Sequence, residues 1–163
     1  MVRASVGEAA TLFVLRKILF AILVLGMAGS GAELVLLKHT EDVWQWIPLV
    51  LLAAGLITCA WHGVSGGASA TRLVRWLMIG FIIGGGLGVY FHYQGLAEFK
   101  LESNPSLAGW DLIWQAIGGK TPPLLAPGAL IQLGLVGLAY TYPPSPRLRR
   151  VSPDEAGGEV PRS

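Results

Sequence analysis

Residues 73–94 have the sequence LVRWLMIGFIIGGGLGVYFHYQ, which is the clearest indication of fold class in the chain. After Arg75 the segment contains no Asp, Glu, Lys or Arg. Its length matches the ~20 apolar residues that a helix needs to cross a hydrocarbon layer of about 30 Å. In lipid, a helix satisfies all of its own backbone hydrogen bonds. The segment is therefore predicted to be a transmembrane helix.

Three further apolar segments accompany it, so that the predicted spans cover about residues 10–37, 46–64, 72–94 and 124–142. The chain has 163 residues, of which 53% are hydrophobic and 13% charged. Soluble domains contain about 25% charged residues. We therefore predict an all-α, polytopic membrane protein with a four-helix transmembrane domain over residues 1–142.

The predicted loop at 95–123 is too long to be a bare connector. Asn104 and Pro105 offer a helix cap and a first-turn proline, and Trp110 and Trp114 lie one turn apart. Tryptophan is enriched at the headgroup level of a bilayer. We therefore predict a short interfacial helix at residues 105–117.

The arginines determine the predicted orientation. All eight lie before the first span, between the second and third, or after the fourth: Arg3, Arg16, Arg72, Arg75, Arg147, Arg149, Arg150 and Arg162. The other two loops carry only Lys38, Lys100 and Lys120 as basic residues. Because positive residues are retained in the cytoplasm, both termini are predicted to be cytoplasmic in a plasma or inner membrane.

The tail at 143–163 is rich in Pro, Gly and charge and has little apolar surface to bury, so it is predicted to be a disordered cytoplasmic segment. The net charge of +2 is the sum of a basic inner face and a mildly acidic outer face. It gives no argument for nucleic-acid binding.

An alternative interpretation treats the first apolar segment as a cleaved signal peptide. Basic residues precede it, and Ser30, Gly31 and Ala32 resemble a cleavage site. The apolar run resumes at Leu34–Leu37, however, and becomes longer than the apolar region of a signal peptide. The length favours a retained span.

Small residues at four-residue spacing allow membrane helices to approach closely. Gly80, Gly84 and Gly88 have this spacing in the third span, while Gly55 and Gly26 belong to similar stripes in the second and first. These stripes predict that the first three spans pack on one another, on a second copy or on other membrane subunits.

Ionisable residues in the spans share faces with these glycines. Seven residues are almost two helical turns, so Glu33 lies on the face of Gly26, and His92 on the face of Gly85. Both are predicted to point into the bundle near its external end, and His62, beside Trp61, belongs to the opposite end. The candidate ligand- or proton-binding residues are Glu33, His39, His92, Glu98 and Asp111.

Imidazole and carboxylate groups are suitable ligands for Zn, Cu or Fe, which makes His39, His92 and Glu33 the candidate metal ligands. A haem between His39 and His92 is a second possibility. No HxxxH or CxxC motif, nucleophile–base pair or phosphate-binding loop accompanies them. The cofactor therefore stays unassigned, and the sequence does not indicate an enzyme.

The leading hypothesis is a non-catalytic subunit or accessory protein of a membrane complex, with an acidic and histidine-containing site on its external face. Its partners would be the lipid bilayer and other membrane subunits or a second copy. One alternative is a small proton- or cation-coupled transporter that uses Glu33, because ionisable groups within membranes often mark such pathways. Another is a metal- or haem-binding membrane redox protein.

Overall fold

The computed structural model describes residues 2–38, 43–118 and 125–143, and its regular elements are all helical. They are α1 (Val2–Leu36), the 3₁₀ helix η1 (Val43–Gln45), α2 (Trp46–Ser65), α3 (Ala68–Ser103), α4 (Gly109–Ile117) and α5 (Leu125–Tyr140). No strand occurs in these residues, so the predicted all-α class is confirmed for them. The predicted disordered tail lies outside the described residues except for Pro143.

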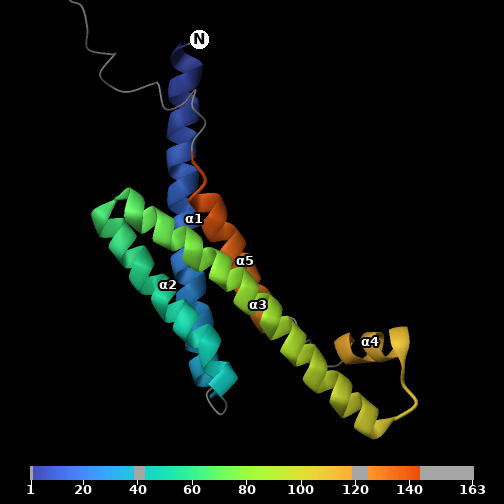
Figure 1. The fold of residues 1–163 in the computed structure, drawn as a ribbon. Helices are drawn as coiled ribbons and strands as arrows, with labels where there is room; N and C mark the ends of the chain where they lie inside the picture. Colours follow the sequence, from blue (N-terminus) through green and yellow to red (C-terminus); the bar gives the residue numbers. More distant parts are fainter. Residues whose placement is uncertain (1, 39–42, 119–124, 144–163) are drawn as a thin grey trace, which may run out of the picture.

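Four long helices form a bundle, and α4 lies apart from it near the far end of α3 (Figure 1). α3 packs against α2 and α5, and α1 packs against the same two helices. The contact between α3 and α5 is the most extensive in the bundle. Each long helix thus has two neighbours and turns one face toward a shared interior.

That interior is a single apolar core to which all four helices contribute. Its buried members are Leu23 and Met27 of α1, Leu52 and Cys59 of α2, Val74, Met78 and Phe81 of α3, and Leu130 and Leu133 of α5. Phe81 is the largest fully buried side chain. In lipid, helices associate through packing of this kind, because lipid supplies no hydrophobic drive for association.

Glycines let α3 and α5 approach backbone to backbone. A Cβ atom built on Gly85 would lie 2.7 Å from the carbonyl oxygen of Pro127, and one built on Gly134 would lie 2.7 Å from that of Met78. A backbone carbonyl cannot move aside as a flexible side chain can. The two helices therefore require glycine at both positions.

The five glycines predicted to mediate packing all face residues of this chain. A Cβ atom on Gly26 would meet Leu133, and one on Gly55 would meet Met27 and Phe81. On α3, Gly80 and Gly84 face Leu51, and Gly88 faces Pro127. All five glycines therefore pack within the bundle, and Gly26, Gly84 and Gly88 have neighbours on α5.

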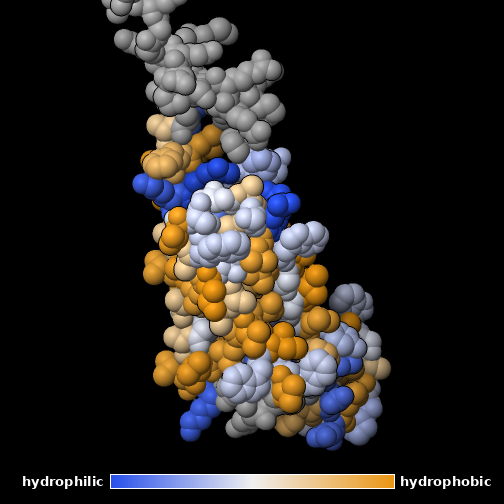
Figure 2. Space-filling view, turned by 60° about the vertical axis from the view of Figure 1, so that its left-hand side comes forward, coloured by the Kyte–Doolittle hydropathy of each residue, from blue (hydrophilic) through white to orange (hydrophobic). Residues whose placement is uncertain are grey.

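Three helical segments are long and apolar enough to cross a membrane: Ala10–Leu36, Val43–Ser65 and Ala68–Ser103. α5 contributes a shorter apolar helix, Pro127–Tyr140. Many large apolar side chains point outward, and Figure 2 shows apolar surface in orange over the middle of the molecule. Apolar exposure on this scale is unusual for a soluble monomer. It is compatible with a location in a membrane.

The bounds of the helices differ in part from the predicted spans. α2 matches the predicted span 46–64 to within one residue, whereas α1 and α3 are longer than the predicted spans 10–37 and 72–94. The long third helix leaves less of the predicted loop 95–123 without regular structure.

The short helix predicted at 105–117 begins later, at Gly109. Asn104 does not cap it, because its Oδ1 accepts hydrogen bonds from the backbone N–H of Ser106 at 3.3 Å and from the Ser106 hydroxyl at 2.7 Å. The residue before a proline avoids helical geometry, and Asn104 ends α3 with φ −146° and ψ 90°. Asn104 and Pro105 therefore form a turn.

Candidate functional site

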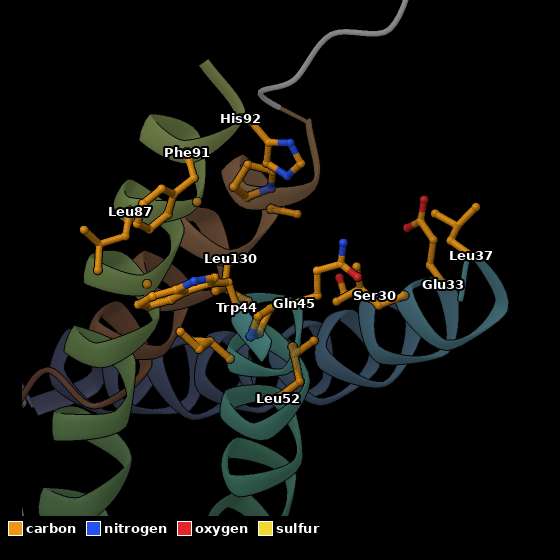
Figure 3. Close-up of a pocket in the computed structure, with 17 residues that line it drawn as sticks. Ser30, Glu33, Leu37, Trp44, Gln45, Leu52, Leu87, Phe91, His92 and Leu130 are labelled. Atoms are coloured by element: carbon orange, nitrogen blue, oxygen red, sulfur yellow. The ribbon is translucent and has the colours of Figure 1, made fainter. Parts of the chain in front are cut away.

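A cavity of about 460 Å³ lies where the C-terminal end of α1, the N-terminal end of α2, the middle of α3 and the N-terminal end of α5 meet (Figure 3). Cavities of roughly 300–1,000 Å³ hold small ligands in proteins. This one draws residues from every helix of the bundle, so it depends on the packing of all four helices.

Apolar side chains and glycines form the interior of the cavity. Leu52 of α2 and Leu130 of α5 are buried in its lining, and Leu87 of α3 lines it with a side chain that is 51% exposed. Gly84 and Gly88 of α3 are also in the lining. Neighbouring helices pack closely at both glycines, with Leu51 near Gly84 and Pro127 near Gly88, so the cavity borders the contacts that join α3 to α2 and α5.

Polar groups gather around the opening of the cavity. Ser30 and Glu33 come from α1, Gln45 from η1 and His92 from α3. Figure 3 shows Glu33 and His92 on different sides of the cavity, held by different helices. The structure thus places two of the predicted site residues on one cavity.

The environment of Glu33 differs from the one expected from its helical face. Gly26 faces α5, but the Glu33 side chain is exposed. α1 ends at Leu36, one turn beyond Glu33, so the carboxylate lies at the rim and not within the packed interior. A carboxylate at a rim keeps contact with water and can attract a ligand to the opening.

An aromatic pair borders the same cavity. The Trp44 and Phe91 rings have centroids 5.6 Å apart and an interplanar angle of 37°. Trp44 is 63% exposed and Phe91 46% exposed, so their ring surfaces remain accessible. Sequence reasoning assigned neither residue to the site, since an aromatic residue at a membrane boundary is more often a lipid anchor.

The other predicted site residues lie elsewhere. Glu98 is exposed on the distal part of α3 and Asp111 is exposed in the first turn of α4, and neither lines the cavity. His39 lies outside the described residues. Within the described ranges, no group of three or more His, Cys, Asp or Glu residues could hold a metal ion. The metal and haem hypotheses that include His39 therefore stay untested predictions.

A second polar cluster occupies the opposite end of the bundle. His62 Nε2 lies 2.9 Å from the Tyr140 hydroxyl, and His62 Nδ1 lies 3.5 Å from Thr71 Oγ1. The Thr71 hydroxyl also donates to the Gly67 carbonyl at 3.2 Å. The expected partner Trp61 is 46% exposed.

Two arginines bind the C-terminal end of α5 beside this cluster. Arg75 donates to the Thr141 carbonyl at 2.7 Å, and Arg16 donates to the Tyr142 carbonyl. The last carbonyls of a helix lack helical partners and attract cations. These contacts hold α1, α3 and α5 together at one end, a role that positive charge alone did not predict.

The two polar ends are separated by apolar packing. The core residues Met27, Met78 and Phe81 lie between them, and the only polar side chains buried in the described ranges are those of Thr58 and Thr141. Within those ranges, no chain of polar side chains joins the cavity to the His62 cluster. This arrangement can bind a ligand at one end of the bundle.

Comparisons of the chain with protein-family models, with curated proteins and with solved structures found no match.

Proposed function

We propose that the protein is a four-span integral membrane protein without catalytic activity that binds an amphipathic molecule in the cavity at its external end. The observation that carries this proposal is the cavity itself, which combines an apolar interior with Ser30, Glu33, Gln45 and His92 at its opening. Ligand sites typically pair an apolar lining with a few polar groups that orient the ligand. Such a protein would serve a membrane complex as an accessory subunit.

The four-span part of the proposal depends on α5. This helix has 16 residues and is about 24 Å long, somewhat less than a hydrocarbon layer of about 30 Å. Arg16 and Arg75 contact the two carbonyls that follow α5. Long basic side chains can reach the membrane interface from positions slightly below the interface, so these arginines can serve the end of a short span. The positive-inside rule then assigns this end to the cytoplasm.

The same proposal assigns α4 to the external interface. Trp110 and Trp114, one turn apart, are 81% and 76% exposed, whereas Ala116 is fully buried. α4 packs against α3, so its buried residue lies toward the protein. The exposed tryptophans would anchor the helix among lipid headgroups.

Ligand binding has better support than the alternative of a transporter that uses Glu33. A transporter needs a route for its substrate, and among the described residues the side chains buried between the two polar ends are apolar apart from Thr58. Glu33 has a position at the rim that suits recognition of a ligand head group.

Native mass spectrometry tests the proposal. The protein, purified from its membrane in a neutral detergent, should retain an amphipathic molecule in a one-to-one complex. Ser30→Trp, which fills the cavity from α1, should remove that molecule, and Leu87→Trp should do the same from α3.

Ala32→Trp is the matched control, because Ala32 is exposed on the same helix and does not line the cavity. It should keep the bound molecule. A wild-type protein that carries no amphiphile and gains none when amphiphiles are added would contradict the proposal.

A further inference from the structure

We infer that two copies of the protein pair in the membrane through the face of α1 that points away from the bundle. This outer face of α1 consists of residues spaced alternately by four and three positions, all of them exposed: Gly7, Thr11, Val14, Ile18, Ala21, Leu25, Ala28 and Ala32. The inference is separate from the ligand cavity, and it rests on the four-span placement in the proposed function.

The spacing of this outer face is that of a heptad repeat. Alternate steps of four and three residues keep one face of a helix against a parallel partner. The pattern continues for about four heptads, a length at which it indicates helix pairing. None of the eight residues is Asp, Glu, Lys or Arg. The Thr11 hydroxyl donates to the Gly7 carbonyl at 2.9 Å, so it is satisfied within α1.

Of the three long apolar helices, α1 is the one least covered by the bundle. Its apolar window is 11% buried, against 22% in each of the other two. Two residues along an α-helix are about 200° apart, so the fully buried Leu23 and the 71% exposed Leu25 point in nearly opposite directions. Ala21 and Ala28 lie beside Leu25 on the outer face, and their small side chains allow a second helix to approach closely.

The outer face continues beyond the membrane in the proposed arrangement. Arg16 and Arg75 contact the carbonyls after α5 at the cytoplasmic boundary, and the N-terminal arm of α1 extends past the other helices (Figure 1). Large apolar side chains of this arm are between 37% and 60% exposed: those of Leu12, Phe13, Val14 and Leu15. Lipid covers apolar side chains within the bilayer but not beyond it, so the arm needs a protein partner. The exposed face of α2 has no such extension, because α2 ends at Ser65.

A second copy is the partner that matches the arm. Copies inserted in one membrane share one orientation, so their α1 helices run parallel and their arms emerge at the same depth. About a two-fold axis along the membrane normal, each residue of the outer face meets its own equivalent. Because the outer face has no charged residue, this pairing opposes no like charges.

The charges beside the outer face are complementary between two copies. Arg3 and Glu8 are five residues apart in the sequence. In parallel heptad helices this spacing joins one flank of the contact to the opposite flank of the partner, where opposite charges determine partner choice and orientation. Two symmetric Arg3–Glu8 pairs are therefore expected between the arms.

Disulfide formation between single cysteines in native membranes tests the pairing. Copper phenanthroline oxidises two thiols to a disulfide only where their Cα atoms approach to about 7 Å or less. Val14→Cys should shift to a disulfide-linked dimer, because Val14 meets its equivalent across the two-fold axis. Phe13→Cys is the matched control: Phe13 is 60% exposed at nearly the same depth but lies off the outer face, so this variant should stay monomeric. The natural Cys59 is 1% exposed and should give no dimer.

Charge reversal tests whether the partner is a second copy. Glu8→Arg should raise the dissociation constant of the dimer at least about fivefold at low salt, the factor that one ion pair at ~4 Å supplies in water. Adding Arg3→Glu to this variant should restore the wild-type constant, because the pair is re-formed with its charges exchanged. Glu98→Arg makes the same change of charge at an exposed position outside α1 and should leave the constant unchanged.

Sedimentation equilibrium of the full-length protein in neutral micelles measures these constants. A double variant that dimerises as weakly as Glu8→Arg would overturn the inference. Cross-linking of Val14→Cys and Phe13→Cys to the same extent, or of neither, would also overturn it. A Val14→Cys disulfide to a different protein in native membranes would show that another subunit covers the arm and would exclude the second copy.

The outcome for the pairing is distinct from the outcome for the ligand cavity. Ser30→Trp, which fills the cavity, should leave the Val14→Cys cross-link unchanged. A wild-type protein that binds no amphiphile but cross-links through Val14→Cys would reject the proposed ligand and support the pairing. A protein that binds an amphiphile but stays monomeric would do the reverse.

Discussion

Gly85 and Gly86 are neighbours in α3, yet their surroundings are opposite. A Cβ atom on Gly85 would lie 2.7 Å from the Pro127 carbonyl oxygen, whereas one on Gly86 has nothing within 4 Å. Successive helical residues are rotated by about 100°, so one glycine faces α5 and the next faces outward. Composition alone cannot distinguish them.

Gly85→Ala should lower the free energy of unfolding by about 1–3 kcal/mol, because the added methyl group meets backbone at a site that is already packed. Gly86→Ala, the matched control, should cause no loss, since alanine forms helix better than glycine. Titration of the purified protein from mild micelles into dodecyl sulfate measures both. Equal stability of the two variants would mean that α3 and α5 do not meet at Gly85.

Helical periodicity describes only the helix that carries a residue. The seven-residue spacing from glycine predicted that Glu33 and His92 point into the bundle, whereas both side chains are exposed and line one cavity. Their role in a common site stays a prediction. The contributions of Trp44 and Phe91 were not predicted, because their local sequence also fits lipid-facing anchors. Whether such a ring borders lipid or a cavity depends on the position of another helix.

At the scale of elements, α5 is the helix whose role matters most for topology. It is the shortest of the four bundle helices, and its C-terminal end is bound by Arg16 and Arg75. Because α1 and α3 both supply an arginine there, the ends of three helices should lie on the same side of the membrane.

Single cysteines test this arrangement. On intact cells, a membrane-impermeant maleimide should label Glu98→Cys, whereas Ser69→Cys and Pro143→Cys should react only after permeabilisation. The natural Cys59 is 1% exposed and provides the unlabelled background. Labelling of Pro143→Cys in intact cells together with Glu98→Cys would show that α5 does not span. Labelling of Ser69→Cys and Pro143→Cys in intact cells, without labelling of Glu98→Cys, would show that the orientation is inverted.

Element bounds were predictable to different degrees. α2 could be located from its apolar run, because Pro48 and the Gly66–Gly67 pair mark its two ends in the sequence. The continuation of α3 to Ser103 could not, because its last residues are polar enough to suggest a loop. They remain helical where α4 packs against α3, with Ala97 and Ala116 buried.

At the scale of the whole molecule, the bundle has two polar ends that differ in chemistry. One end contains Glu33 and His92 at a cavity, and the other contains His62, Tyr140 and two arginines that bind helix carbonyls. Apolar core lies between them. A proton or cation would have to cross that core without polar side chains to replace its hydration, which is costly in a low-dielectric interior.

Reconstituted vesicles should therefore show no proton or sodium flux above that of empty vesicles. A pH-sensitive dye and a sodium-sensitive dye inside the vesicles measure this under an imposed gradient. The matched variant is Glu33→Gln, which should give the same background rate. Flux through the wild-type protein that Glu33→Gln abolishes would restore the transporter hypothesis and contradict ligand binding without transport.

Helix class and the apolar segments followed from the sequence by itself, because segment length, hydropathy and helical periodicity are local properties of the chain. The same local properties predicted glycine stripes on three helices and a common site for Glu33 and His92. Only the tertiary structure decided which glycines face α5, that an aromatic pair borders the cavity and that the Tyr140 hydroxyl lies within hydrogen-bond distance of His62. Each of these features joins residues from separate helices. The relative rotation and tilt of those helices arise from the packing between them, and no single segment encodes that packing.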